Sequence, residues 1–150
     1  MEKMAPILSI ENELFRIYIF YACVLALKVL IMSPLTAMHR FKNKAFANPE
    51  DVVTLKVKPK IHEDVERVRR AHLNDLENIV MFFVASFGYI LTNPSVGFAT
   101  MLFRIFTASR IIHTLVYAVY VIPQPARALA CATGYAVTVY MAIQAILHFI

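Results

Sequence analysis

A run of charged and amide side chains stands directly before an apolar segment at residues 79–84. Within this run, Arg70, Asn74 and Glu77 follow one another at i, i+4 and i+7, so a helix places a cation, an amide and a carboxylate on one face. The apolar segment predicts that this face enters a bilayer. Ionisable groups at that depth are costly in hydrocarbon and usually face a bundle interior or a water-filled cavity. The pattern therefore predicts a polar site inside a membrane protein.

A second polar face lies in a later apolar segment, where Arg110, His113 and Tyr117 stand at i, i+3 and i+7. Guanidinium groups bind carboxylates in bidentate fashion. The candidate arginines for such a site are Arg40, Arg70, Arg110 and Arg127. Because Glu77 can bind an ammonium and Asn74 a peptide group, these residue types suit a small zwitterionic peptide with two carboxylates. An arginine beside a thiol also stabilises the thiolate and so creates a nucleophile.

Composition indicates which elements position these residues. The chain has 150 residues, of which 59% are hydrophobic and only three are glycine, which favours a single all-α domain in a membrane. A bilayer crossing needs about 20 mainly apolar residues. Four segments meet this requirement and predict a four-helix bundle, with helices at about 14–38, 74–92, 96–122 and 126–148.

The charges predict the orientation of the bundle. Nine of the fifteen Lys and Arg residues lie between Arg40 and Arg70, so we expect a cytoplasmic loop at about 39–70 and both termini on the lumenal side. This asymmetry is a topology signal, and we expect no nucleic-acid partner. The polar residues of all four helices then converge at one level near the cytoplasm. Lys28, in the middle of the first span, is expected to point into the bundle.

Several polar residues also have purely structural explanations. Asp75 can serve as a negative charge at the start of the second helix, where it complements the helix dipole. His72 can hydrogen-bond a loop instead of a ligand. Cys23 and Cys131 each lie inside an apolar run, so we expect neither a disulfide nor a metal site from them.

Four motifs along the chain resemble one known family. They are Phe-Ala-Asn-Pro-Glu-Asp (46–51), Arg-Val-Arg-Arg-Ala-His-Leu-Asn-Asp-Leu-Glu-Asn (67–78), Ala-Ser-Arg-Ile-Ile-His-Thr-Leu-Val-Tyr (108–117) and Pro-Gln-Pro-Ala-Arg-Ala-Leu (123–129). In this order they resemble the MAPEG superfamily, the membrane-associated proteins in eicosanoid and glutathione metabolism. Within it, the chain is most similar to the microsomal glutathione transferase branch, whose sister branch is the microsomal prostaglandin E synthases.

The resemblance implies a homotrimer of four-helix protomers, with glutathione as co-substrate, no metal, and sites between neighbouring subunits on the cytoplasmic side. By motif position, the implied glutathione contacts are Arg40, Arg70, His72, Asn74, Glu77, Arg110, His113, Tyr117 and Arg127. Arg127 would stabilise the thiolate. Asp51 matches a position proposed to take part in catalysis in the synthase branch. The family's usual membranes, the endoplasmic reticulum and the outer mitochondrial membrane, are the expected locations.

Three departures from related patterns bear on the activity. Ala128 stands where the synthase branch has a serine, and Leu73 stands where it has an arginine. Both favour a transferase that adds glutathione to hydrophobic electrophiles from the bilayer and reduces lipid hydroperoxides. Val52 replaces a cysteine whose modification activates mammalian transferases, so we expect that switch to be absent. An endoperoxide isomerase and a non-enzymatic membrane scaffold are the alternatives.

Overall fold

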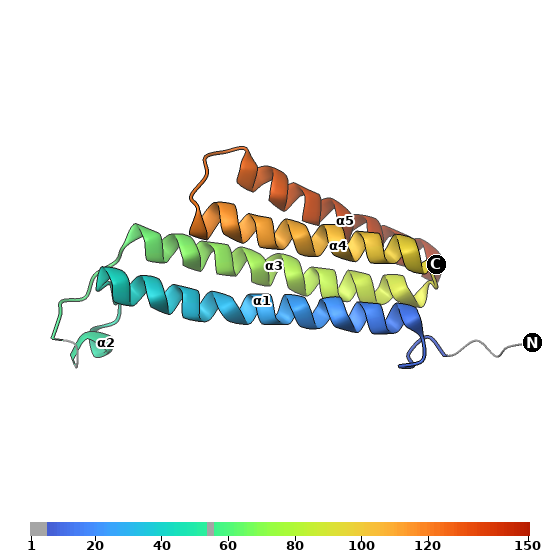
Figure 1. The fold of residues 1–150 in the computed structure, drawn as a ribbon, viewed down its shortest axis with the longest axis horizontal. Helices are drawn as coiled ribbons and strands as arrows, with labels where there is room; N and C mark the ends of the chain where they lie inside the picture. Colours follow the sequence, from blue (N-terminus) through green and yellow to red (C-terminus); the bar gives the residue numbers. More distant parts are fainter. Residues whose placement is uncertain (1–5, 54–55) are drawn as a thin grey trace, which may run out of the picture.

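The computed structural model describes residues 6–53 and 56–150, and within these ranges it is helical with no strand. Its elements are α1 (Glu13–Asn43), the short α2 (Pro49–Val53), α3 (Glu63–Leu91), α4 (Val96–Thr114), the π-helical segment η1 (Leu115–Val119) and α5 (Ala126–Phe149). The four long helices alternate in direction, so the start of α1 and the end of α5 lie at the same end of the bundle (Figure 1).

Helix α1 is longer than the apolar segment that predicts it. Its start is capped by Asn12, whose Oδ1 accepts a hydrogen bond from the backbone N–H of Phe15 at 3.1 Å. Its end is closed by Lys44 in the left-handed region (φ 46°), whose N–H donates to the carbonyls of Arg40 and Phe41. The 31 residues span about 46 Å, well beyond a hydrocarbon core of about 30 Å. Arg40 therefore lies on the helix and not in a loop.

Helix α3 also begins far before its apolar part. His62 caps it, and its first turn carries Glu63, Asp64 and Glu66, which suit the positive end of the helix dipole. Ion pairs one turn apart support these polar turns, with Arg67 on Asp64 at 2.7 Å and Arg69 on Glu66 at 2.8 Å. Residues 39–43 and 63–70 of the expected loop therefore belong to α1 and α3, and α2 lies between these two helices in the chain.

The third apolar segment changes its helix type before it ends. α4 runs from Val96 to Thr114 and continues as η1, in which the N–H of Tyr120 donates to the carbonyl of Leu115 at 2.7 Å. This wider π-helical turn shifts the side chains that follow Thr114 relative to a regular α-helix. The expected single helix at 96–122 is thus divided near Tyr117.

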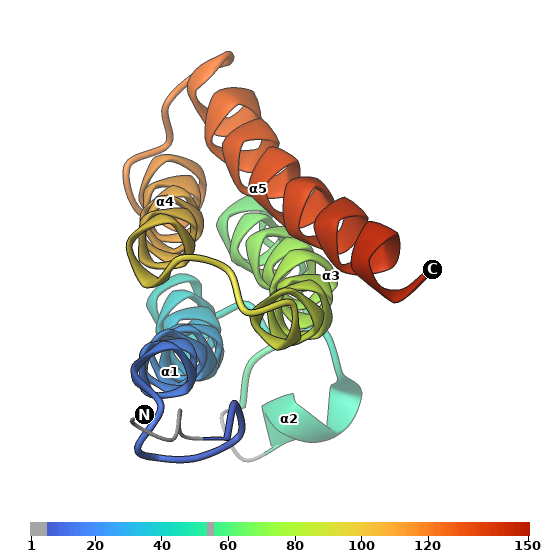
Figure 2. The ribbon, with the colours of Figure 1, turned by 90° about the vertical axis from the view of Figure 1, so that its right-hand side faces the viewer.

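Aromatic side chains fill the core where the long helices meet. Phe82 of α3 stacks on Phe106 of α4, with ring centroids 3.9 Å apart, and Phe103 packs edge-on against Phe82. α5 lies against α3 and α4, on the side away from α1 (Figure 2). It approaches α4 closely at Gly134, where an added Cβ would stand 2.8 Å from Ser109 Oγ. Small residues at such crossings are typical of membrane helix packing.

Three helical segments of the described chain are long and apolar enough to span a membrane: α1, the α4–η1 segment Val96–Val119, and α5. Their outward faces expose large apolar side chains, for example Leu30 at 66% and Leu147 at 67%. α3 is not among the three, because its first turns and the Asn74–Asn78 stretch are rich in polar groups. The polar part of α3 therefore requires shelter from the other helices.

Candidate functional site

Six of the residues predicted to bind a ligand line one open cavity of about 390 Å³, which we call the α3–α5 cavity. α3 contributes Arg70, Asn74 and Glu77, and α4 contributes His113. η1 contributes Tyr117 and α5 contributes Arg127. The remaining lining residues are Leu73, Ala128 and Cys131. The convergence predicted from helical spacing thus exists for α3, α4–η1 and α5.

Tyr117 connects two of the arginines at this cavity. The Arg127 guanidinium carbon lies 4.3 Å from the centroid of the Tyr117 ring, a cation–π contact. Arg70 Nε donates to Tyr117 Oη at 3.3 Å, and Arg70 Nη2 donates to Glu63 at 2.6 Å. These hydrogen bonds, the one to Tyr117 first, raise the pKa of Arg70 above its ordinary value. Because both guanidinium groups stay charged, this side of the cavity attracts anions.

A charge network that is buried except for a small exposed fraction of Lys28 lies directly behind the cavity. Asp75 and Arg110 are both 0% exposed, and Arg110 Nη2 donates to Asp75 Oδ1 at 2.7 Å. Lys28 of α1 forms an ion pair with the other carboxylate oxygen of Asp75. Arg110 Nη2 also lies 2.7 Å from Asn74 Oδ1 and 3.3 Å from His113 Nδ1. The network therefore ties α1, α3 and α4 to two residues that line the cavity.

The structure corrects the simplest explanation of Asp75. It is not a charge at a helix start, since α3 begins at Glu63, a full three turns earlier. Its negative charge balances two buried cations from neighbouring helices. The prediction that Lys28 points into the bundle is confirmed. The sequence contained a signal for the buried role of Asp75, because a lysine in the middle of an apolar span requires a buried negative partner.

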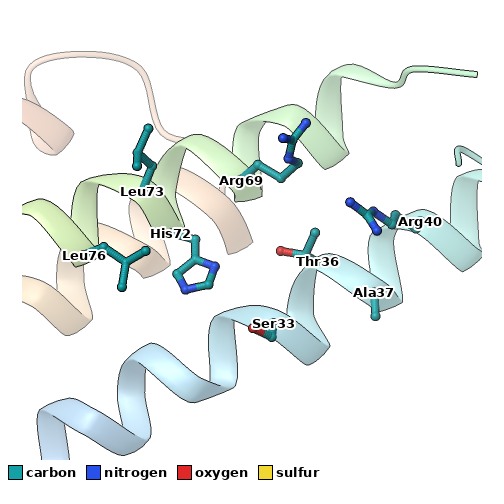
Figure 3. Close-up of a pocket in the computed structure, with 8 residues that line it drawn as sticks. All are labelled: Ser33, Thr36, Ala37, Arg40, Arg69, His72, Leu73 and Leu76. Carbon is teal, nitrogen blue, oxygen red and sulfur yellow. The ribbon is translucent and has the colours of Figure 1, made fainter. Parts of the chain in front are cut away.

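Arg40 and His72 lie apart from the other candidates, in a second cavity of about 350 Å³ between α1 and α3. Figure 3 shows the Arg40 guanidinium and the His72 ring in the space between the two helices, with Arg69 on the α3 side. We call this space the α1–α3 cavity. Leu73 lines both cavities, because it lies on the exposed ridge of α3 between them.

Asp51 and Arg110 are the candidates that line neither of these cavities. Asp51 is exposed on α2, beyond the ends of the long helices, and accepts a hydrogen bond from Asn48 Nδ2 at 3.1 Å (Figure 1). Arg110 is buried in the charge network. Among residues 6–53 and 56–150, no three His, Cys, Asp or Glu side chains gather as a metal site.

The geometry defines what the α3–α5 cavity can bind. Arg70 and Arg127 provide positive charge, Glu77 provides one carboxylate, and Asn74 and His113 provide neutral hydrogen-bonding groups. This set matches a polar ligand that carries more than one anionic group and an ammonium. The neighbouring α1–α3 cavity adds further cations on the other side of α3. The exposed apolar residue Leu73 lines both cavities, and Leu76 lines the α1–α3 cavity.

Comparison with known proteins gives long alignments to two kinds of membrane enzyme. The chain is 46% identical to the microsomal glutathione S-transferase 1 of Mus musculus and 44% identical to that of Homo sapiens, in each case over 88% of both chains. It is 34% identical to the prostaglandin E synthase of Homo sapiens over 67% of both chains. Residues 18–147 match the model of the MAPEG family, which covers most of the chain. The chain therefore belongs to the MAPEG family.

Proposed function

We propose that this protein is a membrane-bound glutathione transferase. It ionises the glutathione thiol and adds the thiolate to hydrophobic electrophiles that arrive from the bilayer, and it uses the same thiolate to reduce lipid hydroperoxides. The observation that carries the proposal is the α3–α5 cavity, where residues of three helices form a site for a small zwitterionic peptide. The relatives named glutathione transferases match more of the chain, and at higher identity, than those named prostaglandin E synthases.

Glutathione has two carboxylates, one ammonium, peptide groups and a thiol, and the cavity offers a partner for each of these groups except the second carboxylate. Arg70 is placed for a carboxylate and Glu77 for the ammonium. Asn74 and His113 are placed for the peptide groups. The Arg127 guanidinium stacks on Tyr117, and no ion pair joins it to a carboxylate among the described residues. We assign to Arg127 the stabilisation of the thiolate, since its charge is not neutralised by the protein.

A homotrimer would unite the two cavities of the site. Arg40 and His72 face away from the α3–α5 cavity of their own chain, so they can contact the same glutathione only across a subunit interface. We propose that the α1–α3 cavity of one subunit faces the α3–α5 cavity of its neighbour. The exposed Asp51 on α2 would join this composite site from the neighbouring subunit.

We further propose that α3 is a fourth crossing, sheltered by the other long helices within one transmembrane domain of 150 residues. The basic ends of α1 and α3 then lie in the cytoplasm, in the endoplasmic reticulum or the outer mitochondrial membrane. This orientation opens both cavities toward cytosolic glutathione. The apolar faces of the bundle remain in contact with lipid, where hydrophobic substrates dissolve.

The test is glutathione conjugation to a hydrophobic aryl halide by the detergent-purified protein and by Arg127→Ala. We expect turnover by the wild type and a loss of most of the rate in the variant, measured at saturating glutathione. Arg104→Ala is the matched control, because Arg104 is an exposed arginine of α4 that donates to Tyr21 and lines neither cavity. It should retain the wild-type rate.

Two other outcomes would redirect the proposal. If neither protein conjugates but glutathione still raises the melting temperature, the site is correct and the chemistry is not, and conversion of a prostaglandin endoperoxide becomes the activity to measure. Ala128 and Leu73 at the cavity argue against that isomerase reaction. If glutathione changes neither rate nor melting temperature, the transferase proposal fails and a scaffold role takes its place.

A further inference from the structure

We propose that Arg110 is a positioning residue, which makes the α3–α5 cavity present hydrogen-bond donors to its ligand. The sequence predicts Arg110 as a direct ligand contact, but its side chain is 0% exposed and lies behind the cavity wall. The inference rests on the proposed function, because it specifies which groups of glutathione meet Asn74 and His113. It concerns the direction in which these two side chains donate.

The Arg110 guanidinium is fixed on one side by Asp75. Nε donates to Asp75 Oδ1 at 3.2 Å, and Nη2 donates to the same oxygen at 2.7 Å. The second oxygen, Oδ2, pairs with Lys28 and accepts from Thr114 at 3.5 Å. Arg110 and Asp75 are both 0% exposed, and two guanidinium nitrogens donate to the same carboxylate, so the guanidinium has little freedom to turn even though its Nη1 has no hydrogen-bond partner among the described residues.

Arg110 then dictates how Asn74 is oriented. Its Nη2 donates to Asn74 Oδ1 at 2.7 Å, so the amide carbonyl points at Arg110. A guanidinium has no acceptor atom, and the reversed amide would place N–H groups against it. The Asn74 side chain also lines the cavity. With its carbonyl turned toward Arg110 behind the cavity wall, Asn74 directs its NH₂ group, a donor, toward a ligand.

The same argument fixes the tautomer of His113. Arg110 Nη2 also lies 3.3 Å from His113 Nδ1, where it can donate only by sharing one of the two N–H groups that it directs at Asp75 and Asn74. Since the guanidinium has no acceptor atom, we infer that Nδ1 accepts in this shared bond. The imidazole is therefore neutral and carries its proton on Nε2. His113 lines the cavity, so Nε2–H is the group that it offers to a ligand. Asn74 and His113 can each donate or accept a hydrogen bond, and Arg110 orients both so that they donate to the ligand.

The consequence is a specific prediction about the ligand. The groups of glutathione that contact Asn74 and His113 are acceptors, namely a peptide carbonyl or a carboxylate, and not the ammonium. Without Arg110 both side chains could adopt the opposite orientation and offer acceptors, which would repel the same groups. The ammonium is left for Glu77, the only carboxylate among the residues that line this cavity in the described chain.

The first test needs no glutathione, and its one variant serves only to assign the signal. Nitrogen-15 NMR of the reconstituted protein with ring-labelled histidine, assigned with His113→Gln, reports the protonated nitrogen of His113. We expect the neutral Nε2–H tautomer. A signal for protonated Nδ1 would overturn the proposal even in a protein that binds glutathione normally. Because this measurement is independent of the ligand, it also separates a failure of this inference from a failure of the proposed function.

The second test is a double-variant cycle on glutathione affinity, measured by calorimetry. Arg110→Lys keeps a cation for Asp75, but one ammonium cannot hold Asp75, Asn74 and His113 in the same fork geometry. We expect Arg110→Lys to raise the Kd for glutathione by about tenfold. In the double variant Arg110→Lys and Asn74→Ala, we expect the rise in Kd to be much smaller than the product of the rises in the two single variants. Fully multiplicative losses would mean that Arg110 contacts the ligand by itself, which would refute the positioning role.

Lys28→Met is the matched control for damage to the network. Lys28 pairs with the same Asp75 but contacts neither Asn74 nor His113, and it lines neither cavity. We expect its Kd for glutathione to stay within about twofold of the wild type. A loss as large as that of Arg110→Lys would show that any disturbance of the buried charges weakens binding, and the specific role of Arg110 would then be wrong.

Discussion

Replacing Asp75 by asparagine should lower the apparent melting temperature of the protein by about 6–20 °C. Asp75 is 0% exposed and is the single carboxylate between Lys28 and Arg110. The substitution keeps the shape of the side chain but leaves two buried cations facing a neutral amide. Breaking a buried charge pair in this way costs about 3–5 kcal/mol, and each kcal/mol corresponds to about 2–4 °C for a chain of this size.

Asp64→Asn is the matched control on the same helix. Asp64 also accepts a hydrogen bond from an arginine, Arg67, at 2.7 Å, the same distance as between Asp75 and Arg110. Its side chain is 40% exposed, so water replaces the lost contact and the expected cost is below about 1 kcal/mol. The comparison contrasts a buried carboxylate that holds two cations with an exposed carboxylate that holds one arginine at the same distance.

The assay is circular dichroism of the helical signal during heating, in one detergent and at one scan rate, since unfolding of such proteins is often irreversible. Lys28→Met combined with Asp75→Asn provides an internal check. Removing Lys28, one of the two cations left without a carboxylate partner, should recover part of the lost stability. This recovery is the coupling energy in the double-variant cycle of Lys28→Met and Asp75→Asn. If Asp75→Asn lowers the midpoint no more than Asp64→Asn does, the buried network does not stabilise the bundle as we infer.

Three further results follow from the geometry. The Arg67 guanidinium lowers the pKa of Asp64 below its ordinary 3.8. The ion pair of Asp64 with Arg67 therefore stabilises the fold fully above pH 3.8, and this stabilisation is lost as the pH falls through the folded-state pKa. The melting temperatures of wild type and Asp64→Asn should then converge in acid. Gly134→Ala should destabilise the protein by about 1–3 kcal/mol, because the added Cβ would stand 2.8 Å from the oxygen of Ser109. Gly97→Ala has open space around it and should be neutral or stabilise the protein by up to about 1 kcal/mol in the same melting assay. Tyr117→Phe keeps the ring beneath the stacked guanidinium and should bind glutathione more tightly than Tyr117→Leu, by about 0.5–2 kcal/mol in calorimetry; equal affinities would contradict the cation–π contact.

Local features of the fold were predictable from the sequence because they depend on neighbours along the chain. Apolar segments of about 20 residues identify membrane helices, and the 3.6-residue period groups Arg70, Asn74 and Glu77 on one face. The structure indeed brings these three residues to one cavity with His113 and Tyr117. The length of α3 was underestimated, since polar turns outside the bilayer are stabilised by ion pairs and not by hydrophobicity.

Packing between helices decided the rest. His72 and Asn74 are only two residues apart, yet they point about 200° apart around α3 and so line different cavities. The roles of Asp75 and Arg110 depend on which helices lie behind them, and no local pattern specifies those neighbours. The sequence by itself determined the membrane class, the helices and the polar faces. Only the tertiary structure separated the residues that line a cavity from those buried behind it, because burial depends on the rotation of each helix against its neighbours.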